Sequence, residues 1–382
     1  MTRPTIPAER YAERLARVAE VARARGIDGL LLGVGSDLRY LAGYVALPLE
    51  RLTMLVVPAD GRPILVAPRL EALPARASPA AAGGLADVAP WEETEDPVAI
   101  VARVLGPFVD SVGVSDRLWA MFLLRLQAAL PNARFTMATP SMRELRIRKD
   151  PDEIELLRLA ARAADRVVGQ IARGRLVGRT EADVAREVRE RLLAEGHDEA
   201  EFAIVASGPN SASPHHTAGE RIIAPGDPIV LDIGGSLGGY HSDITRTLWV
   251  TGGDRGKAPD PEFSRLYEVL RGAQDEATAS ARPGVAAERV DAVARGIIDG
   301  AGFGEHFIHR TGHGIGLDGH EDPYLVAGSA EALEPGMAFS VEPGIYLEGR
   351  YGARIEDIVV CGPDGPIVLN EAPHELLVVE GR

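Results

Sequence analysis

Two glutamates in the last third of the sequence stand in apolar runs that are typical of β-strands. Glu342 follows AFSV and precedes Pro343–Gly344, and Glu356 lies in RIEDIVV. A glutamate is rarely buried without a partner, because removing its charge from water is costly. The chain must therefore fold so that a cation or another polar group meets each side chain. For either glutamate alone, a buried salt bridge, for instance with Arg354, is a sufficient explanation.

Two aspartates stand earlier in the chain, in the segment PIVLDIGGSLGGYHSDITRTLWV. Asp232 follows an apolar run, and Asp243 comes 11 residues later (243 − 232 = 11), beyond a glycine-rich turn. An antiparallel hairpin of this length can bring both carboxylates to one place. Either aspartate alone is more simply explained as the cap of a strand end or a turn, where aspartate is common.

A histidine surrounded by glycines follows in HRTGHGIGLDGHEDPY. Three glycines between residues 312 and 316 allow the backbone to bend closely, so the imidazole of His313 can point into a cavity. The pattern lacks the later glycine and the leading parallel strand of a dinucleotide-binding motif, which excludes that interpretation. Taken alone, His313 and His320 are more simply explained as hydrogen-bonded structural histidines.

Taken together, these residues predict a site for two metal ions. Four carboxylates carry a charge of about −4, which balances two divalent cations, and one neutral imidazole adds a ligand without changing that balance. Oxygen-rich ligation with a single histidine favours Mn²⁺, Mg²⁺ or Co²⁺ over a thiolate zinc site. We expect two Mn²⁺ ions, with Co²⁺ or Zn²⁺ as alternatives. Two such ions would hold a hydroxide between them, an arrangement suited to amide hydrolysis. The predicted ligands are Asp232, Asp243, His313, Glu342 and Glu356.

The composition limits the class of protein. At 382 residues the chain exceeds the usual size of one domain, so we expect two. Its net charge of 41 − 56 = −15 argues against nucleic acid or an anionic membrane as the main partner. The single Cys361 permits no intrachain disulfide. The charged N-terminal segment lacks a signal-peptide core, and no apolar run reaches the ~18 residues of a membrane span, so we expect a cytoplasmic protein.

Hydrophobic periodicity divides the chain near residue 150. Before it, a helix over residues 8–25 and short β-like runs at 29–32, 52–57 and 63–66 predict a small α/β domain, with an amphipathic segment around 116–130. Residues 72–86, rich in alanine and proline, are expected to form a loop or a loosely packed crossover.

After residue 150 the pattern predicts an α+β domain with a largely antiparallel sheet. A long helix begins near Pro151, capped by Asp150 or Asp152, and Thr180 with Asp183 opens a second helix. Two further helices are predicted at 261–281 and 285–301. The expected strands are 202–206, 228–233, 244–250, 338–341, 345–347, 355–361 and 376–379.

The motifs VLDIGG, SDITRT, TGHGIGL, VEPGIY and RIED, in this order, resemble those of the pita-bread metallopeptidases, in particular the Xaa-Pro peptidase branch of aminopeptidase P and prolidase. RYLAGY and RIRKDPDEIELLRLA resemble the N-terminal domain and the domain junction of that branch, which methionine aminopeptidases lack. The resemblance implies a creatinase/prolidase-type N-terminal α/β domain over residues 1–145. It also implies an α+β pita-bread (creatinase/aminopeptidase) catalytic domain over residues 146–382.

The resemblance also implies roles for the five predicted ligands. Asp232 and Asp243 would chelate one metal ion, and His313 and Glu342 would bind the other. Asp243 and Glu356 would bridge the two ions. Glu342 would in addition take the proton from the nucleophilic water as the general base.

Four further residues match functional positions of the family. His215 would lie beside the scissile bond, although the adjacent His216 leaves the register open. His320 would stabilise the tetrahedral intermediate. Arg354, two residues before Glu356 and therefore expected on the same strand face, would brace the ligating carboxylates. Tyr346 would line the substrate cleft.

The implied activity is that of a metal-dependent exopeptidase that hydrolyses the Xaa-Pro bond of dipeptides or short peptides through a metal-bridging hydroxide. The implied partners are short proline-containing peptides, with no nucleic acid and no membrane, and the implied assembly is a homodimer. Creatinase-like relatives act on other C–N bonds, and some relatives only bind ligands, so both alternatives stay open. Dipeptidase and aminopeptidase activity also stay open, because no group for the free carboxylate of a dipeptide is identifiable.

Overall fold

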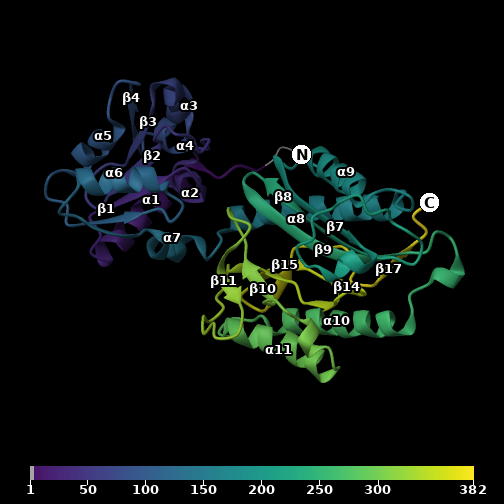
Figure 1. The fold of residues 1–382 in the computed structure, drawn as a ribbon. Coiled ribbons are helices and arrows are strands. Elements are labelled where there is room, and N and C mark those ends of the chain that lie inside the picture. Colours follow the sequence, from purple (N-terminus) through teal and green to yellow (C-terminus); the bar gives the residue numbers. More distant parts are fainter. Residues whose placement is uncertain (1–3) are drawn as a thin grey trace. The chain divides into compact units, whose positions relative to one another are not determined.

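The computed structural model describes residues 4–382, which separate into two compact units, Thr5–Arg146 and Ile147–Arg382 (Figure 1). The N-terminal unit contains a six-stranded mixed sheet in the order β4-β3-β2-β1-β5-β6. Its elements are α1 (Ala8–Ala24), β1 (Gly29–Gly33), α2 (Ser36–Ala42), β2 (Met54–Pro58), β3 (Ile64–Pro68), α3 (Ala72–Ala77), α4 (Pro79–Ala82), β4 (Asp87–Trp91), α5 (Pro97–Leu105), β5 (Ser111–Val114), α6 (Ala120–Ala129), β6 (Arg134–Met137) and α7 (Thr139–Arg146).

Of the two alternatives predicted for residues 72–86, the loop was wrong, whereas a crossover is correct, because the segment connects β3 to the parallel strand β4. The segment forms the short helices α3 and α4, and Pro79 occupies the first turn of α4. Alanine has the highest helix propensity, and proline is well tolerated at a helix start, so the composition that suggested a loop also suits two short helices.

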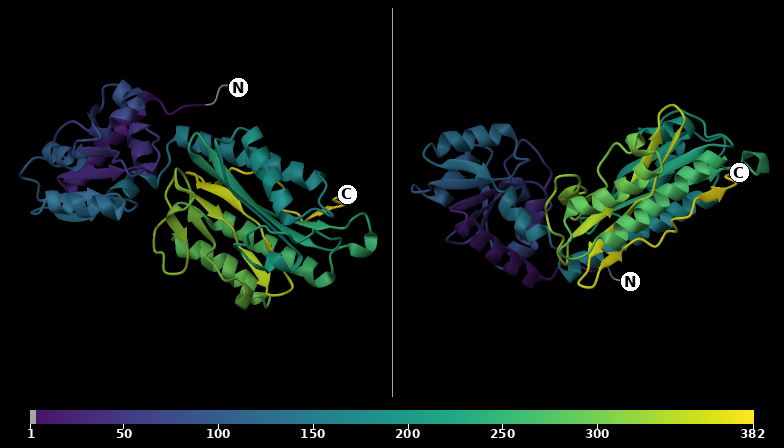
Figure 2. Two further views of the ribbon diagram at one scale, coloured as in Figure 1. Left: turned by 45° about the horizontal axis from the view of Figure 1, so that its top comes forward. Right: turned by 90° about the horizontal axis from the view of Figure 1, so that it is seen from below.

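The C-terminal unit contains two large sheets with helices on their outer faces (Figures 1 and 2), together with a two-stranded sheet of β13 and β14. One sheet has the order β17-β9-β8-β7 and is covered by α8 and α9; the other has the order β11-β10-β12-β15-β16 and packs with α10 and α11. The elements are α8 (Pro151–Arg173), α9 (Glu181–Ala194), β7 (Glu199–Ser207), β8 (Pro228–Leu237), β9 (Tyr240–Val250), α10 (Pro261–Ser280), α11 (Ala287–Gly300), β10 (Gly312–Gly314), β11 (Glu321–Leu325), β12 (Ala338–Val341), β13 (Gly344–Leu347), β14 (Tyr351–Arg354), β15 (Asp357–Cys361), β16 (Pro366–Val368) and β17 (Leu377–Val379).

The starts of α8 and α9 follow local side-chain chemistry, as the sequence predicted. Asp150 accepts a hydrogen bond from the backbone N–H of Glu153, and the Glu153 carboxylate accepts one from the N–H of Asp150, which completes a capping box. Of the two aspartates proposed as the cap, Asp150 is therefore the one used. Thr180 caps α9 by accepting from the N–H of Asp183 over 3.1 Å.

The hairpin of β8 and β9 sets the positions of two of the predicted ligands. Its two turn residues, Gly238 and Gly239, have φ values of +65° and +88°, which glycine adopts without steric cost. The register pairs Asp232 with Thr245 and Gly234 with Asp243. Because residues two apart on a strand point to the same side, both aspartates lie on one face of the sheet.

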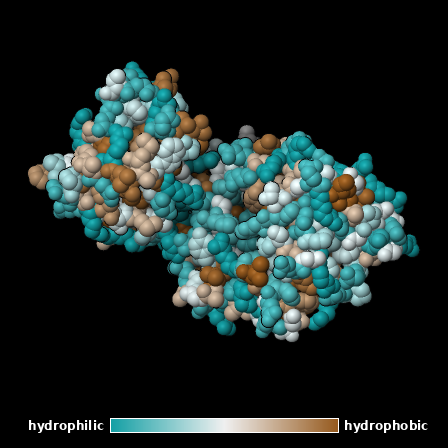
Figure 3. Space-filling view, in the orientation of Figure 1, coloured by the Kyte–Doolittle hydropathy of each residue, from teal (hydrophilic) through white to brown (hydrophobic). Residues whose placement is uncertain are grey.

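Figure 3 shows a mostly hydrophilic face on which apolar residues form small, separate groups. Within residues 4–382, no helix combines the length and the apolar character that crossing a bilayer requires.

Candidate metal centre

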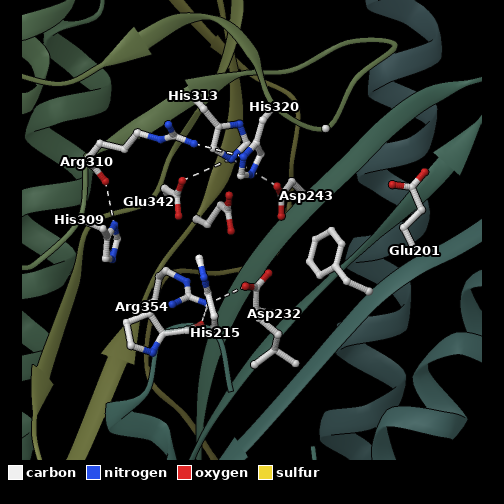
Figure 4. A pocket seen from close by; sticks show the side chains of 15 residues that line it. Glu201, His215, Asp232, Asp243, His309, Arg310, His313, His320, Glu342 and Arg354 are labelled. Atoms are coloured by element: carbon white, nitrogen blue, oxygen red, sulfur yellow. Dashed lines mark hydrogen bonds and ion pairs between the residues drawn. The ribbon is translucent and has the colours of Figure 1, made fainter. Parts of the chain in front are cut away.

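The five predicted ligands line one cavity of about 580 Å³ in the C-terminal unit (Figure 4). They come from both sheets. Asp232 lies on β8, Asp243 on β9 and His313 on β10, while Glu342 directly follows β12 and Glu356 directly precedes β15. The backbone of Glu356 pairs with that of Thr245 on β9, which joins the two sheets at the cavity.

Three of the five offer ligand atoms close enough to share one ion. In Asp243, His313 and Glu356, one such atom each lies within 4.8 Å of the others. Nε2 of His313 is 3.6 Å from Oδ2 of Asp243 and 3.4 Å from Oε1 of Glu342. Nδ1 of His313 lies 3.0 Å from the Gly314 carbonyl, so it carries the proton and Nε2 presents a lone pair to the carboxylates.

The glycines beside His313 are required by close packing of the backbone. A Cβ atom on Gly312 would lie 1.9 Å from the Ser340 carbonyl oxygen, and one on Gly314 would lie 2.2 Å from that of Asp322. The neighbouring strands therefore approach β10 more closely than a side chain at residue 312 or 314 would permit. This close packing fixes the backbone of His313 and so holds its imidazole in the cavity.

The electrostatics of the cluster are those of a cation site. Burial, reinforced by neighbouring carboxylates, raises the pKa of Asp243 and of Glu356 well above the ordinary range. Burial also raises the pKa of Glu342 to about 7, against the opposing effect of Arg354. Burial lowers the pKa of His313 to about 3, so its ring is neutral at physiological pH and able to bind a metal.

Asp232 supplies a direct test of whether a cation fits. Its Oδ2 forms an ion pair with Arg354, but its Oδ1 is buried and has no hydrogen-bond partner among the described residues. A buried carboxylate oxygen without a partner is unfavourable unless something else binds it. Four carboxylates with one contacting guanidinium leave three negative charges uncompensated, so the residues present fit divalent cations.

A second layer of residues holds the carboxylates in place. Thr245 donates from Oγ1 to Oε2 of Glu356 over 2.7 Å, and Ser340 donates to Oε1 of Glu342 over 3.2 Å. Arg354 contacts Asp232 at 2.5 Å and donates through Nε to Oγ1 of Thr245 over 3.1 Å.

Arg354 and Glu356 do not lie on one strand, contrary to what the sequence suggested, although both side chains line the cavity. β14 ends at Arg354, and Ile355 separates it from the residue that pairs with β9. The chain therefore leaves one sheet and joins another between the two residues. Arg354 reaches Asp232 directly and Glu356 only through Thr245, so it still braces two of the carboxylates.

Both histidines predicted beside the ligands line the cavity. The ring of His320 packs on that of His313, with 3.9 Å between the ring centroids. His215 lines the cavity, whereas His216 does not and instead places Nε2 2.7 Å from Oε2 of Glu181. The register that the sequence left open therefore puts His215 at the cavity.

Tyr346 does not line the cavity, contrary to the expectation from the sequence. Its hydroxyl accepts a hydrogen bond from Nη1 of Arg354 over 2.6 Å and lies 2.9 Å from Nε2 of His309. It therefore lies behind the wall of the cavity and orients two residues that form the wall.

Sequence reasoning missed several residues of the cavity wall, among them Glu201, His309 and Arg310. His309 and Arg310 directly precede the TGHG motif, and this adjacency was a signal that could have identified them. Glu201 carried no such signal, because it stands near the start of β7 and reaches the cavity only through the pairing of β7 with β8. Figure 4 shows Arg310 and Glu201 on opposite sides of the carboxylate cluster.

Comparison with known proteins agrees with this site. Residues 155–363 match the metallopeptidase family M24, and residues 14–148 match the creatinase/prolidase N-terminal domain. These matches, together with similarity to solved structures, confirm the predicted family and its combination of the two folds.

Three relatives illustrate the similarity. The chain is 48% identical to the probable dipeptidase PepE of Mycobacterium tuberculosis, over 97% of each chain. It is 35% identical to an Xaa-Pro dipeptidase of Lactobacillus helveticus, over 90% of this chain and 92% of the relative. The crystal structure of dipeptidase PepE from Mycobacterium ulcerans superimposes with a TM-score of 0.91 at 45% identity, covering 98% of this chain and 99% of the other.

Proposed function

Because the chain belongs to the metallopeptidase family M24, we propose that it is a metal-dependent dipeptidase acting on Xaa-Pro dipeptides. The observation that carries the proposal is the cluster of three buried carboxylates and the partly buried Glu342 around the neutral His313, in a cavity large enough for a dipeptide. Relatives named dipeptidase and Xaa-Pro dipeptidase, which match over nearly their whole length, support this substrate class over longer peptides.

The proposed metal ligands are those named from the sequence, and the proposed ions are two Mn²⁺. Asp232 and Asp243 would hold one ion, His313 and Glu342 the other, with Asp243 and Glu356 shared between them. Bound there, the ions would lower the pKa of a water molecule and polarise the scissile carbonyl.

The remaining steps are assigned to side chains of the cavity. Glu342 accepts the proton of the attacking water, and Ser340 holds its carboxylate in place by donating to Oε1. His215 orients the peptide beside the scissile bond. Arg354 holds the carboxylate of Asp232 in place through their ion pair.

The hydrogen bonds of His320 suit the role of stabilising the tetrahedral intermediate. Nη2 of Arg310 lies 3.2 Å from Nδ1 of His320, and a guanidinium can only donate, so Nδ1 accepts. Burial, together with Arg310 and His215, lowers the pKa of His320, which favours the neutral ring. The neutral ring then carries its proton on Nε2, where it can donate to an oxyanion.

The test is to purify the protein, measure bound Mn, Co and Zn, and assay Xaa-Pro dipeptides, Xaa-Pro tripeptides and dipeptides without proline. We expect about two metal ions per chain, and cleavage of Xaa-Pro dipeptides that is lost on chelation and restored by Mn²⁺. A protein that binds no metal and cleaves none of these peptides would overturn the proposal. Cleavage of tripeptides alone would reassign it to aminopeptidase activity.

We also propose that the enzyme is cytoplasmic and, as its family resemblance implies, a homodimer. Light scattering after size-exclusion chromatography, which gives the molar mass in solution, tests the dimer against a chain mass of 40.7 kDa.

A further inference from the structure

The loop that joins β7 to β8 carries His215 and is tied to one buried carboxylate outside the cavity, Glu181. Oε1 of Glu181 accepts from the backbone N–H of Ser207 over 2.8 Å, from its hydroxyl over 2.7 Å and from Nδ2 of Asn210 over 3.0 Å. Oε2 lies 2.7 Å from Nε2 of His216 and 3.4 Å from the N–H of Gly219. One oxygen thus holds the first part of the loop, at Ser207 and Asn210, and the other holds the later part, at His216 and Gly219.

Glu181 is itself fixed by the helix on which it stands. It is the first residue of α9, where the positive end of the helix dipole favours a carboxylate. Its backbone N–H donates to the carbonyl of Arg221 over 3.0 Å, and the N–H of Ala182 donates to that of Gly219 over 3.0 Å. The first turn of α9 therefore binds the returning arm of the loop through both backbone and side chain.

The carboxylate is charged although its side chain is fully buried. Burial alone would raise the pKa of Glu181, but the hydrogen bonds from Ser207, His216 and Asn210 outweigh it and leave the pKa below its ordinary value. Hydrogen bonds to an ionised acceptor are about twice as strong as neutral ones, so this set holds the loop firmly.

His215 depends on this loop for its position. No hydrogen bond to its imidazole is found within the described part of the chain, so the backbone on either side of it must place the ring. On the cavity side, the Pro214 carbonyl accepts from Nη2 of Arg354 over 3.4 Å, and the Ser211 hydroxyl accepts from the N–H of Gly352 over 2.9 Å. On the other side, the side chains of Asn210 and His216 form hydrogen bonds with the carboxylate of Glu181.

From this arrangement we infer that Glu181 is a positioning residue of the enzyme, which acts on catalysis only by holding His215 at the cavity. Glu181 does not itself line the cavity, so it has no contact with a bound peptide. The inference rests on the proposed function for its catalytic consequence, but the structural link between Glu181 and the loop can be measured without activity.

The first experiment is a double-mutant cycle of Glu181→Gln with His215→Ala, assayed on an Xaa-Pro dipeptide with the metal-loaded enzyme. Glutamine has the shape of glutamate, but its amide group points a donor at groups that also donate. We expect Glu181→Gln to lower kcat/KM by roughly 10- to 100-fold in the wild-type background and by less than about 3-fold in the His215→Ala background. Equal losses in both backgrounds would overturn the inference.

Two further variants separate positioning from general destabilisation. Asp165→Asn is the matched control, because Asp165 on α8 similarly anchors a loop by accepting from Nδ2 of Asn370 and the N–H of Glu371, away from the cavity. We expect it to leave kcat/KM within about 3-fold of wild type. His216→Ala removes one of the contacts of Glu181, and His216 is partly exposed, so this variant should fold even if Glu181→Gln does not. We expect it to lower kcat/KM by a smaller factor than Glu181→Gln does.

Hydrogen–deuterium exchange gives a readout that needs no activity. Peptides covering residues 208–219 should exchange faster in Glu181→Gln or His216→Ala than in wild type or Asp165→Asn, at equal metal content. Unchanged exchange of this segment in both Glu181→Gln and His216→Ala would overturn the inference. If the wild-type protein cleaves no Xaa-Pro dipeptide, the proposed function fails, and the exchange data still decide whether Glu181 holds the loop.

Discussion

Glu356 and Asp357 are consecutive in the chain and both are buried, yet their surroundings are opposite. The Glu356 carboxylate faces three other carboxylates across the cavity, and burial with this repulsion raises its pKa. Asp357 points to the other side of its strand, where it contacts Arg246 at 2.7 Å and His374 at 2.5 Å. Burial alone would raise the pKa of Asp357, but the effects of Arg246 and His374 are larger and leave the pKa below its ordinary value.

The difference separates two uses of a buried carboxylate. Asp357 has its charge compensated by the protein itself, and its partner Arg246 also donates to the carbonyls of Glu356, Ala372 and Pro373, which ties the C-terminal segment to β9. Glu356 lacks such compensation and fits a site that binds cations from solution. We therefore expect substitution of Glu356 to abolish function, and substitution of Asp357 to weaken the fold.

The largest expected effect is on activity, in Glu356→Gln. In the proposed site Glu356 is a ligand of both ions, and its loss should lower kcat/KM by more than ~100-fold, because changes to groups behind metal ligands already cost ~10- to 100-fold. Metal content measured by mass spectrometry should fall as well. The metal-free variant should unfold at no lower denaturant concentration than metal-free wild type, since one of several repelling charges is gone. A variant that keeps its metals and its activity would remove Glu356 from the site.

The second effect is on stability, in Asp357→Asn. Removing the carboxylate leaves the buried guanidinium of Arg246 without its charged partner, which typically costs about 3–5 kcal/mol. Denaturant unfolding of the metal-free protein should show this loss as a lower midpoint. Equal stability of Asp357→Asn and Glu356→Gln in the metal-free state would mean that the two carboxylates do not differ as described.

The third effect is the stabilisation of the folded chain by bound metal, which should distinguish Glu356 from Asp357. A ligand that binds only the native state at 100 times its Kd stabilises it by about 2.7 kcal/mol. Mn²⁺ should therefore raise the Tm of the wild type and of Asp357→Asn, but far less that of Glu356→Gln. An equal rise in all three proteins would indicate that Mn²⁺ binds elsewhere.

The sequence identified residues that line one cavity more readily than the elements that carry them. Glu342 and Glu356 were identifiable because glutamates in apolar runs demand partners, and the caps at Asp150 and Thr180 because they act over three residues. The short strands β10, β14 and β16 were not predicted, because three or four positions carry little period-2 pattern. The equally short β12, β13 and β17 were predicted from their apolar residues. The end of β14 before Ile355 also has no local signal in the sequence. It arises because Arg354 pairs in one sheet and Glu356 pairs with a strand of another.

The role of Glu181 was out of reach for a similar reason. The sequence identifies Thr180 and Asp183 as a helix start, and Glu181 between them is ordinary for a first helical turn. Its partners Ser207 and His216 lie 26 and 35 residues further along the chain. Only the folded loop brings them to one carboxylate.

The smallest expected effect extends the comparison to Glu181, a third buried carboxylate and one compensated by the protein, as Asp357 is. Its pKa is lowered on folding from the ordinary value of 4.5, so its ionised form stabilises the native state above that pH. This contribution is lost as the pH falls below 4.5 through the folded-state pKa. Glu181→Gln should thus melt a few degrees below wild type at pH 7, and the gap in Tm should narrow as the pH falls below 4.5. A gap that stays constant with pH would mean that the charge of Glu181 contributes nothing beyond its shape.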